Sequence, residues 1–320
     1  MQIRINKFDK SIDLNKISQF SYLVQNTTGY LEEDTTLESI REELEEARDN
    51  YKFILFEGYE NNQLIGILLL FTNTPKFGLI WDWHPFVLPN TDKSKNAIEL
   101  IKECIEFAEK NDIIRIEVCF TIQNNEDKQR YREHLKLYKV LGFYHVIEEA
   151  EMEINLNDIK PKRIKFPENF KTKSIKEVEI NDLFNCSFEI MNQSRDNMFL
   201  DLTEEQKWEV IKNYFDPSKP IIQDASIILT EGNRIIGFSI ARHSTFETGK
   251  ATIGPFGILP NFRNKGLGEA LLLLSLKQLL ENNFEIANLD VAVENEPAYK
   301  LYLKVGFKKI FSSNILALNC

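Results

Sequence analysis

The stretch NFRNKGLGEALL, residues 261–272, combines basic side chains, two glycines and the beginning of an apolar helix. Gly266 and Gly268 would let the backbone approach a ligand closely, and the unpaired N–H groups of a first helical turn favour an anion. Arg263 and Lys265 add positive charge beside that turn. The stretch therefore predicts a binding site for a phosphate-bearing ligand. The alternative is a tight turn without a ligand, because glycines between a strand and a helix often serve only the turn.

The elements that must position this stretch occur in both halves of the chain. Residues 53–71 (FILFEGYENNQLIGILLLF) and 225–243 (ASIILTEGNRIIGFSIARH) each predict two strands joined by a polar turn. The segments PFVLPN and PFGILPN follow, with Pro89 matching Pro260. This order of elements predicts an internal repeat.

The repeat continues to the end of each half. A long amphipathic helix is expected over residues 97–110 and again over 267–282. A β-rich run then precedes the closely similar phrases LYKVLGF and LYLKVGF. The sequence thus predicts two α/β domains, over residues 1–158 and 166–320, with the charged, proline-containing segment 157–169 as their boundary.

The composition of the chain limits the classes of partner that we expect it to bind. With 320 residues, 43% of them hydrophobic, the chain can bury the cores of about two domains. A formal net charge of -10 argues against nucleic acid, because binding phosphates requires a surplus of Lys and Arg. No apolar run approaches the roughly 20 residues that span a bilayer, and the N-terminal MQIRINKFDK lacks the apolar stretch of a signal peptide. We therefore expect a cytoplasmic protein without a nucleic-acid or membrane partner.

Cysteine and histidine spacing gives no indication of a metal site. Cys104, Cys119, Cys186 and Cys320 stand far apart without any C-x-x-C spacing, which suits reduced thiols. The 4 histidines likewise lack metal-ligand spacing. The sequence therefore predicts no metal cofactor.

Two segments resemble a known family. PFGILPNFRNKGLGEALL is similar to the acyl-CoA-binding motif of the GNAT superfamily of N-acyltransferases, in which Q/R-x-x-G-x-G/A lies between a strand and a helix. LDVAVENEPAYKLYLKVGF is similar to the segment that follows in that family, where an Asn, an Ala and a Tyr precede Gly-Phe. The resemblance covers most of the second half and, more weakly, the first. It implies a tandem GNAT protein in which each domain has a mixed sheet whose fourth and fifth strands splay apart.

The resemblance also implies how acetyl-CoA, the cosubstrate, would bind to the second domain. The backbone beside the splay would bind the pantetheine arm, the glycine-rich stretch would surround the pyrophosphate, and Asn295 and Tyr302 would contact the cofactor beyond the splay. The residues implied are Phe256, Gly257 and Ile258 for the arm, and Arg263, Asn264, Lys265, Gly266, Leu267, Gly268 and Glu269 for the pyrophosphate.

Amide formation needs a base to deprotonate the amine and an acid to protonate the departing thiolate. Tyr302 matches the family tyrosine that lies close to the sulfur and is the candidate acid; its alternative role is packing on the sheet. Asp290 is the candidate base, because ribosomal-protein N-terminal acetyltransferases of the family carry a Glu at this place. Other members place the base elsewhere, and Asp290 could instead be a solvated strand carboxylate.

The first half has lost the glycine-rich stretch. The matching residues read PNTDKSKNAIELI, with Asp92 opposite Arg263, Lys95 opposite Gly266, and Ala97 opposite Gly268. An acidic side chain and a long side chain would oppose a pyrophosphate there. The first domain is therefore interpreted as a degenerate GNAT domain, with Tyr138 as the relic of Tyr302. A second acyl-CoA site is the alternative.

WDWHPF, residues 81–86, favours core packing over an aromatic binding site.

These features predict an N-acetyltransferase that moves an acetyl group directly from acetyl-CoA to an amine, with a small molecule as the expected acceptor. The alternatives are a catalytically silent acyl-CoA-binding or regulatory module, and an enzyme that acetylates protein N-termini or lysines. Acids between the first two helices of the second domain could attract a cationic amine. Asp201 or Thr203 could instead cap a helix. These acids are Asp196, Asp201, Glu204 and Glu205.

Overall fold

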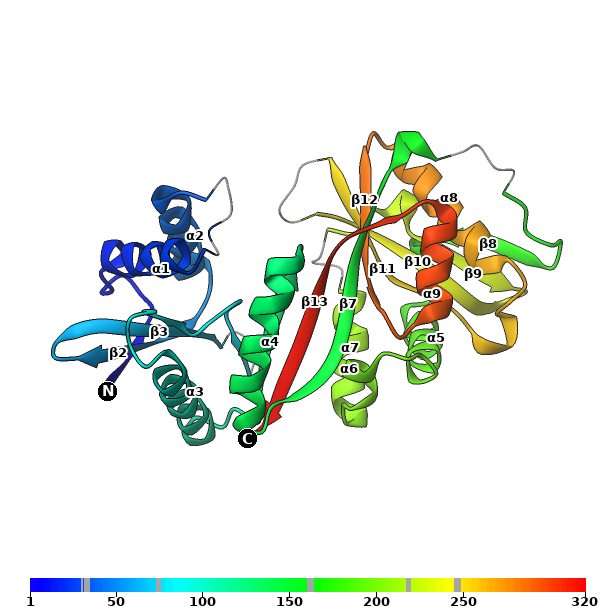
Figure 1. Cartoon of the computed structure of the whole chain (residues 1–320). Coiled ribbons are helices and arrows are strands. Elements are labelled where there is room, and N and C mark those ends of the chain that lie inside the picture. The colour runs from blue at the N-terminus through cyan, green and yellow to red at the C-terminus, as the bar shows by residue number, and fades with distance from the viewer. Residues whose placement is uncertain (30, 32–34, 73–75, 160–163, 217–219, 245–248) are drawn as a thin grey trace. The chain divides into compact units, whose positions relative to one another are not determined.

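The chain forms two compact units, Met1–Val146 with Ser313–Cys320, and Ile147–Ser312. The computed structural model describes residues 1–29, 31, 35–72, 76–159, 164–216, 220–244 and 249–320. Part of the predicted boundary segment, residues 160–163, lies outside these ranges. Each unit packs helices against a mixed sheet, which confirms the predicted α/β class (Figure 1).

The first unit has a sheet in the order β1-β2-β3-β4-β6, with β5 paired to β3. β4 and β6 pair in parallel, whereas β1, β2 and β3 form antiparallel pairs. The elements are β1 (Gln2–Lys7), α1 (Leu14–Thr28), α2 (Leu37–Asn50), β2 (Phe53–Glu60), β3 (Gln63–Phe71), β4 (Phe77–Ile80), β5 (Phe86–Val87), α3 (Lys93–Lys110), β6 (Arg115–Ile122) and α4 (Asn125–Val140).

The second unit repeats this plan with strands in the order β7-β12-β11-β10-β9-β8. β11 and β12 pair in parallel, as β4 and β6 do in the first unit. The elements are β7 (Tyr144–Asn155, from Ile147 onward), β8 (Phe170–Ser174), α5 (Ile180–Asn192), α6 (Asn197–Leu200), α7 (Glu204–Tyr214), β9 (Ile227–Glu231), β10 (Arg234–His243), β11 (Lys250–Ile258), α8 (Leu267–Glu281), β12 (Ile286–Ala292), α9 (Glu296–Val305) and β13 (Lys308–Asn319, as far as Ser312).

Both predicted hairpins form, and turn chemistry explains where they bend. The loop between β2 and β3 is Asn61–Asn62, with φ values of 50° and 65°. Asn tolerates this left-handed conformation, which matches the twist of a two-residue hairpin. Gly232 takes the corresponding place between β9 and β10, with φ 58°.

The central strands are apolar on both faces because helices cover both faces. On β3, Ile67 and Leu69 pack with residues of α1 and α2, whereas Leu68 and Leu70 pack with residues of α3. A strand buried on both sides reads as a continuous apolar run, as GILLLF does. In the second unit, the leucine-rich α8 buries Leu271, Leu272, Leu273, Leu276 and Leu279.

The last residues of the chain pack with the first unit rather than the second. Leu316 is fully buried beside residues of α3 and β6. The backbone N–H of Cys320 donates to the carbonyl of Ile114 at 2.9 Å. The predicted domains place a single boundary along the chain. The compact units instead assign residues 147–158 to the second unit and 313–320 to the first.

Candidate active site

β11 and β12 separate part of the way along β11. They pair from Lys250 to Thr252, and the described residues show no pairing beyond that point. β11 nevertheless stays paired with β10 as far as Ile258. The edge of residues 253–258 that faces β12 thus keeps backbone groups without a strand partner. Such an edge can bind an extended ligand by strand-like hydrogen bonds.

The N-terminus of α8 follows the end of β11. Gly266 is its N-cap, with φ 76° and ψ -3°, a conformation that favours glycine. Among the described residues no side chain caps this helix, and a Cβ on Gly266 would meet no heavy atom within 4 Å. The first-turn N–H groups thus have no side-chain cap and the space beside Gly266 is open, so they can bind an anion.

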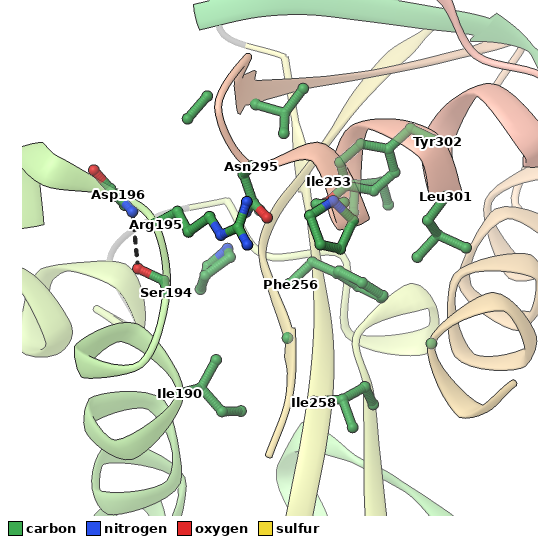
Figure 2. Close-up of a pocket in the computed structure, with 18 of the residues that line it drawn as sticks. Ile190, Ser194, Arg195, Asp196, Ile253, Phe256, Ile258, Asn295, Leu301 and Tyr302 are labelled. Carbon is green, nitrogen blue, oxygen red and sulfur yellow. Dashed lines mark hydrogen bonds between the residues drawn. The ribbon is translucent and has the colours of Figure 1, made fainter. Parts of the chain in front are cut away.

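A cleft of about 970 Å³ joins the free edge of β11, the N-terminus of α8 and the start of α9 (Figure 2). Both candidate catalytic residues, Tyr302 and Asp290, line it. Lys265 and Leu267 do not line it: the Lys265 ammonium lies over the Phe262 ring, and Leu267 is buried. The other predicted cofactor-binding residues that line the cleft are Phe256, Gly257, Ile258, Arg263, Asn264, Gly266, Gly268, Glu269 and Asn295.

Two charged residues at the mouth of the cleft hold neighbouring elements in place. Arg263 donates from Nε to the carbonyl of Ile258 at 2.9 Å, and from Nη1 to the carbonyl of Gln193 at 3.2 Å. Because a guanidinium has five N–H donors, others remain for an anion. Glu269 pairs with Lys304, which ties α8 to α9.

Tyr302 projects from α9 into the cleft with its ring in an apolar surround. The residue is 6% exposed, and its ring centroid lies 6.1 Å from that of Phe256 and 5.9 Å from that of Phe307. No described residue hydrogen-bonds its hydroxyl. Burial raises the pKa of Tyr302 well above its usual value. The hydroxyl therefore keeps its proton at neutral pH and can donate it.

Asp290 lies on β12 directly opposite Glu151 of β7. Its side chain remains in contact with solvent, but the surrounding strands remove much of the hydration of the carboxylate. This desolvation, and secondarily the like charge of Glu151, raise the pKa of Asp290 to about 6. The group is therefore mostly ionised at pH 7 and can accept a proton.

Sequence reasoning missed several residues that line the cleft. Arg242 on β10 donates to the carbonyls of Gly254 and Tyr214, and thereby ties the end of α7 to β11. Arg195, after α5, points toward Asn295 (Figure 2) and donates to the carbonyl of Glu294 at 3.4 Å. These side chains come from separate elements without any common spacing, so no motif could indicate them.

Of the four acids expected near the acceptor, Asp196 lines the cleft. Asp201, Glu204 and Glu205 do not. Thr203 caps α7, because its hydroxyl accepts from the N–H of Gln206 at 3.3 Å. The capping interpretation therefore holds for Thr203.

In the first unit the corresponding groups are already bonded or packed. Tyr138 is fully buried, and its hydroxyl donates to the carbonyl of His84 at 2.8 Å. Asp92 caps α3 by accepting from the N–H of Lys95 at 3.2 Å, so a carboxylate occupies the place of an anion. Trp83 packs on Phe120 with ring centroids 5.4 Å apart. These contacts support the degenerate interpretation and core packing for WDWHPF.

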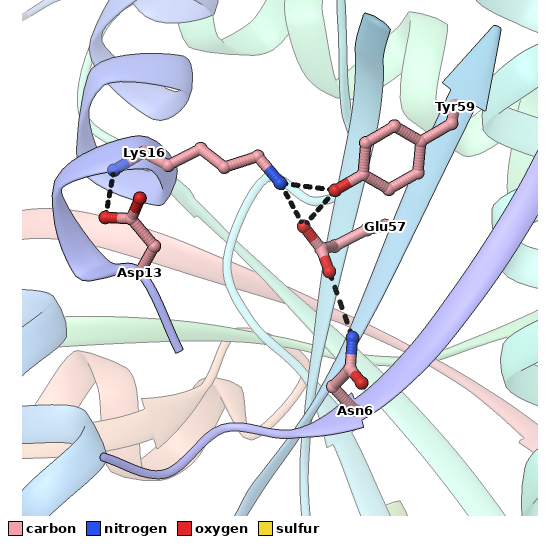
Figure 3. Close-up of polar contacts among 5 residues, drawn as sticks. All are labelled: Asn6, Asp13, Lys16, Glu57 and Tyr59. Atoms are coloured by element: carbon pink, nitrogen blue, oxygen red, sulfur yellow. Dashed lines mark hydrogen bonds and ion pairs between the residues drawn. The ribbon is translucent and has the colours of Figure 1, made fainter. Parts of the chain in front are cut away.

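A polar cluster elsewhere in the first unit has its partners within the fold (Figure 3). Glu57 on β2 accepts from Lys16 of α1 at 2.8 Å, from Tyr59 at 2.7 Å and from Asn6 of β1 at 3.0 Å. Lys16 also donates to the hydroxyl of Tyr59. Because Glu57 is 7% exposed, these bonds offset the loss of its hydration. The cluster fixes α1 on the sheet.

We expect Lys16→Met to lower the free energy of unfolding of the first unit by about 1–3 kcal/mol, because it leaves a buried carboxylate without its cation. Adding Glu57→Gln should recover part of the loss. Urea denaturation measures both. Lys110→Met, which removes an exposed ion pair to Glu106, is the control and should change stability by roughly 0.5 kcal/mol or less. Equal losses in the two lysine variants would contradict the assignment.

Metal-binding clusters and membrane-spanning helices are both absent from the described residues. Within these ranges, no group of three or more His, Cys, Asp and Glu side chains is arranged to hold a metal ion. None of the helices described has the length and apolar character required to cross a membrane.

Comparisons with known proteins agree with this geometry. Residues 180–307 match the profile of the Acetyltransferase (GNAT) family. An N-alpha-acetyltransferase of Sulfurisphaera tokodaii is 37% identical over 75 residues, which are 23% of this chain and 45% of that protein. The match thus spans less than half of that relative.

Solved structures extend the similarity of fold over the whole chain. A GCN5-related N-acetyltransferase from Sphaerobacter thermophilus superimposes with a TM-score of 0.65 at 15% identity, covering 99% of this chain and 95% of that one. A tandem GNAT protein from the clavulanic acid biosynthesis pathway gives 0.57 at 11% identity, covering 99% and 98%. The predicted resemblance is confirmed: residues 180–307 match the GNAT acetyltransferase family, and the chain has the fold of a tandem GNAT protein.

Proposed function

We propose that the second unit is an N-acetyltransferase that moves an acetyl group from acetyl-CoA to an amine. The observation that carries the proposal is one cleft that contains a free strand edge, an uncapped helix N-terminus and Tyr302. The first two features suit an extended arm that ends in a pyrophosphate. The third places a proton donor beside them.

The residues present fit acetyl-CoA. The open space before Gly266 would admit a pyrophosphate, and the remaining N–H groups of Arg263 would bind it. Asn295 and Phe256 would contact the arm from either side of the splay. Lys265 lies over Phe262 and Leu267 is buried, so their contribution is limited to the backbone.

Acetyl-CoA supplies an activated acyl carbon when it is bound. Asp290 then accepts a proton from the acceptor amine, directly or through a water, and this creates the nucleophile. Tyr302 donates its hydroxyl proton to the sulfur that departs. The carboxylate and the phenol begin in the required protonation states, because the pKa of Asp290 is about 6 and that of Tyr302 is well above its usual value.

The proposed base predicts an acidic limb in the pH profile of kcat/KM. The carboxylate accepts protons only above its pKa, so the rate should fall about tenfold per pH unit below pH 6. If the acceptor amine has a known pKa, the effect of its own ionisation can be divided out of the pH profile of kcat/KM. Asp290→Asn should lower kcat roughly 10²- to 10⁴-fold and remove the limb. If the acidic limb persisted in Asp290→Asn, the group responsible for the limb would be a residue other than Asp290.

The acceptor is proposed to be a small amine. A second candidate, a protein N-terminus, is favoured by the similarity to proteins named N-alpha-acetyltransferases. Thiol release measured over a panel of small amines, lysine peptides and free-N-terminus peptides distinguishes them. Acetyl-CoA binding without acetyl transfer to any of these amines would instead indicate a silent acyl-CoA-binding module.

A further inference from the structure

Two carboxylates face each other across neighbouring strands at the cleft. Asp290 of β12 and Glu151 of β7 are direct partners in the antiparallel register. Like charges in that position destabilise a sheet. Glu153, which is also on β7, instead forms an ion pair with the ammonium of Lys250 at 2.9 Å. The like-charge pair therefore needs an explanation other than the stability of the sheet.

A row of side-chain hydrogen bonds crosses three strands and ends on Glu151. Thr252 donates from its hydroxyl to Oδ1 of Asn288 at 2.8 Å. Asn288 in turn donates from Nδ2 to Oε1 of Glu151 at 3.2 Å. The threonine thus fixes the amide with its NH₂ group toward β7. The row therefore holds the Glu151 carboxylate in place through a directed amide donor.

The row lies where the cleft begins. Thr252 and Asn288 are the last partners before β11 and β12 separate, and Asp290 follows Asn288 on the same face of β12. Asp290 and Thr252 line the cleft, whereas Glu151 does not. Repulsion from a fixed negative charge on β7 would direct the Asp290 carboxylate away from β7 and toward the cleft.

Resting on the proposed function, we propose that Glu151, held by Asn288 and Thr252, is a positioning residue that makes Asp290 a stronger base and keeps it directed at the acceptor amine. The raised pKa of Asp290, to which the charge of Glu151 contributes, agrees with this role. Because the two carboxylates are direct strand partners, variants of both are compared. The other charged or titratable groups that line this cleft are Glu149 of β7, Arg195 and Asp196 after α5, Tyr214 of α7, Arg242 of β10, Arg263 before α8, Glu269 of α8, and Lys300, Tyr302 and Lys304 of α9.

Glu151→Gln tests the role, because it removes the charge while the amide oxygen can still accept from Asn288. We expect the acidic limb of kcat/KM to move by about one pH unit or less toward lower pH. At neutral pH kcat should fall several-fold, with the Kd for acetyl-CoA unchanged. Thr252→Val should give a smaller shift in the same direction. Glu148→Gln, on the opposite face of β7, is the matched control and should leave the profile unchanged.

A second measurement does not depend on turnover. Carbon-13 NMR titration of the Asp290 carboxyl group, in the protein without substrates, should show the same shift in Glu151→Gln. An unchanged titration would overturn the proposal. So would loss of transfer at every pH in Glu151→Gln combined with an active Asp290→Asn, because Glu151 would then be the base. If the wild type acetylated no amine, the proposed function would fail, while the titration would still decide whether Glu151 acts on Asp290.

Discussion

Tyr302→Phe is expected to lower kcat by about 10²- to 10⁴-fold while the Kd for acetyl-CoA stays nearly the same. The substitution removes only the hydroxyl of this cleft-lining residue, and that hydroxyl has no hydrogen-bond partner among the described residues. The ring would keep its contacts with Phe256 and Phe307. Stopped-flow thiol release gives kcat, and calorimetry gives Kd.

The first unit offers a matched control in Tyr138→Phe. That hydroxyl is buried and bonded to the carbonyl of His84, so its loss should cost about 1 kcal/mol of stability and leave kcat unchanged. A Tyr302→Phe enzyme with wild-type kcat would remove Tyr302 from the mechanism. Equal losses of kcat in both variants would indicate a shared structural cause.

Transplanting the first unit's residues into the glycine-rich stretch should strongly weaken the binding of acetyl-CoA. The triple variant Arg263→Asp, Gly266→Lys, Gly268→Ala reverses a charge beside the helix N-terminus and strains a left-handed position. Lost charge-assisted hydrogen bonds are worth roughly 1.5–3 kcal/mol each, so affinity should fall at least about 10²-fold. Calorimetry measures this loss.

The reverse transplant into the first unit is the control. Asp92→Arg, Lys95→Gly, Ala97→Gly should leave both the affinity and the stoichiometry as in the wild type, at one acetyl-CoA per chain. Two equivalents bound by the wild type would contradict the degenerate interpretation. Unchanged affinity in the first triple variant, with folding verified by thermal unfolding, would place the pyrophosphate elsewhere.

The repeat and the local turns could be read from the sequence because they depend on residues close together in the chain. Asn61–Asn62 and Gly232 mark hairpins through their own backbone preferences. Gly266 indicates a left-handed turn before a helix for the same reason. Alignment of the two halves likewise shows that the first half lacks this glycine. In the structure, Asp92 of the first half caps α3.

The direction in which each side chain points from the helix axis decided which residues of the glycine-rich stretch line the cleft. Consecutive helical residues point in different directions, so Leu267 enters the core between two glycines that line the cleft. Lys265 lies over Phe262, a contact that no spacing rule provides. The motif thus determined the backbone path, whereas packing selected the side chains.

The sequence by itself predicted two α/β halves, one glycine-rich turn suited to an anion and the candidate acid Tyr302. Only the tertiary structure decided what surrounds Asp290. Glu151 lies far from it in the chain and becomes its partner through strand register, which long-range pairing sets. The assignment of residues 313–320 to the first unit has the same cause. The physical reason is that a sheet joins distant segments by burial and backbone hydrogen bonds, which local sequence does not encode.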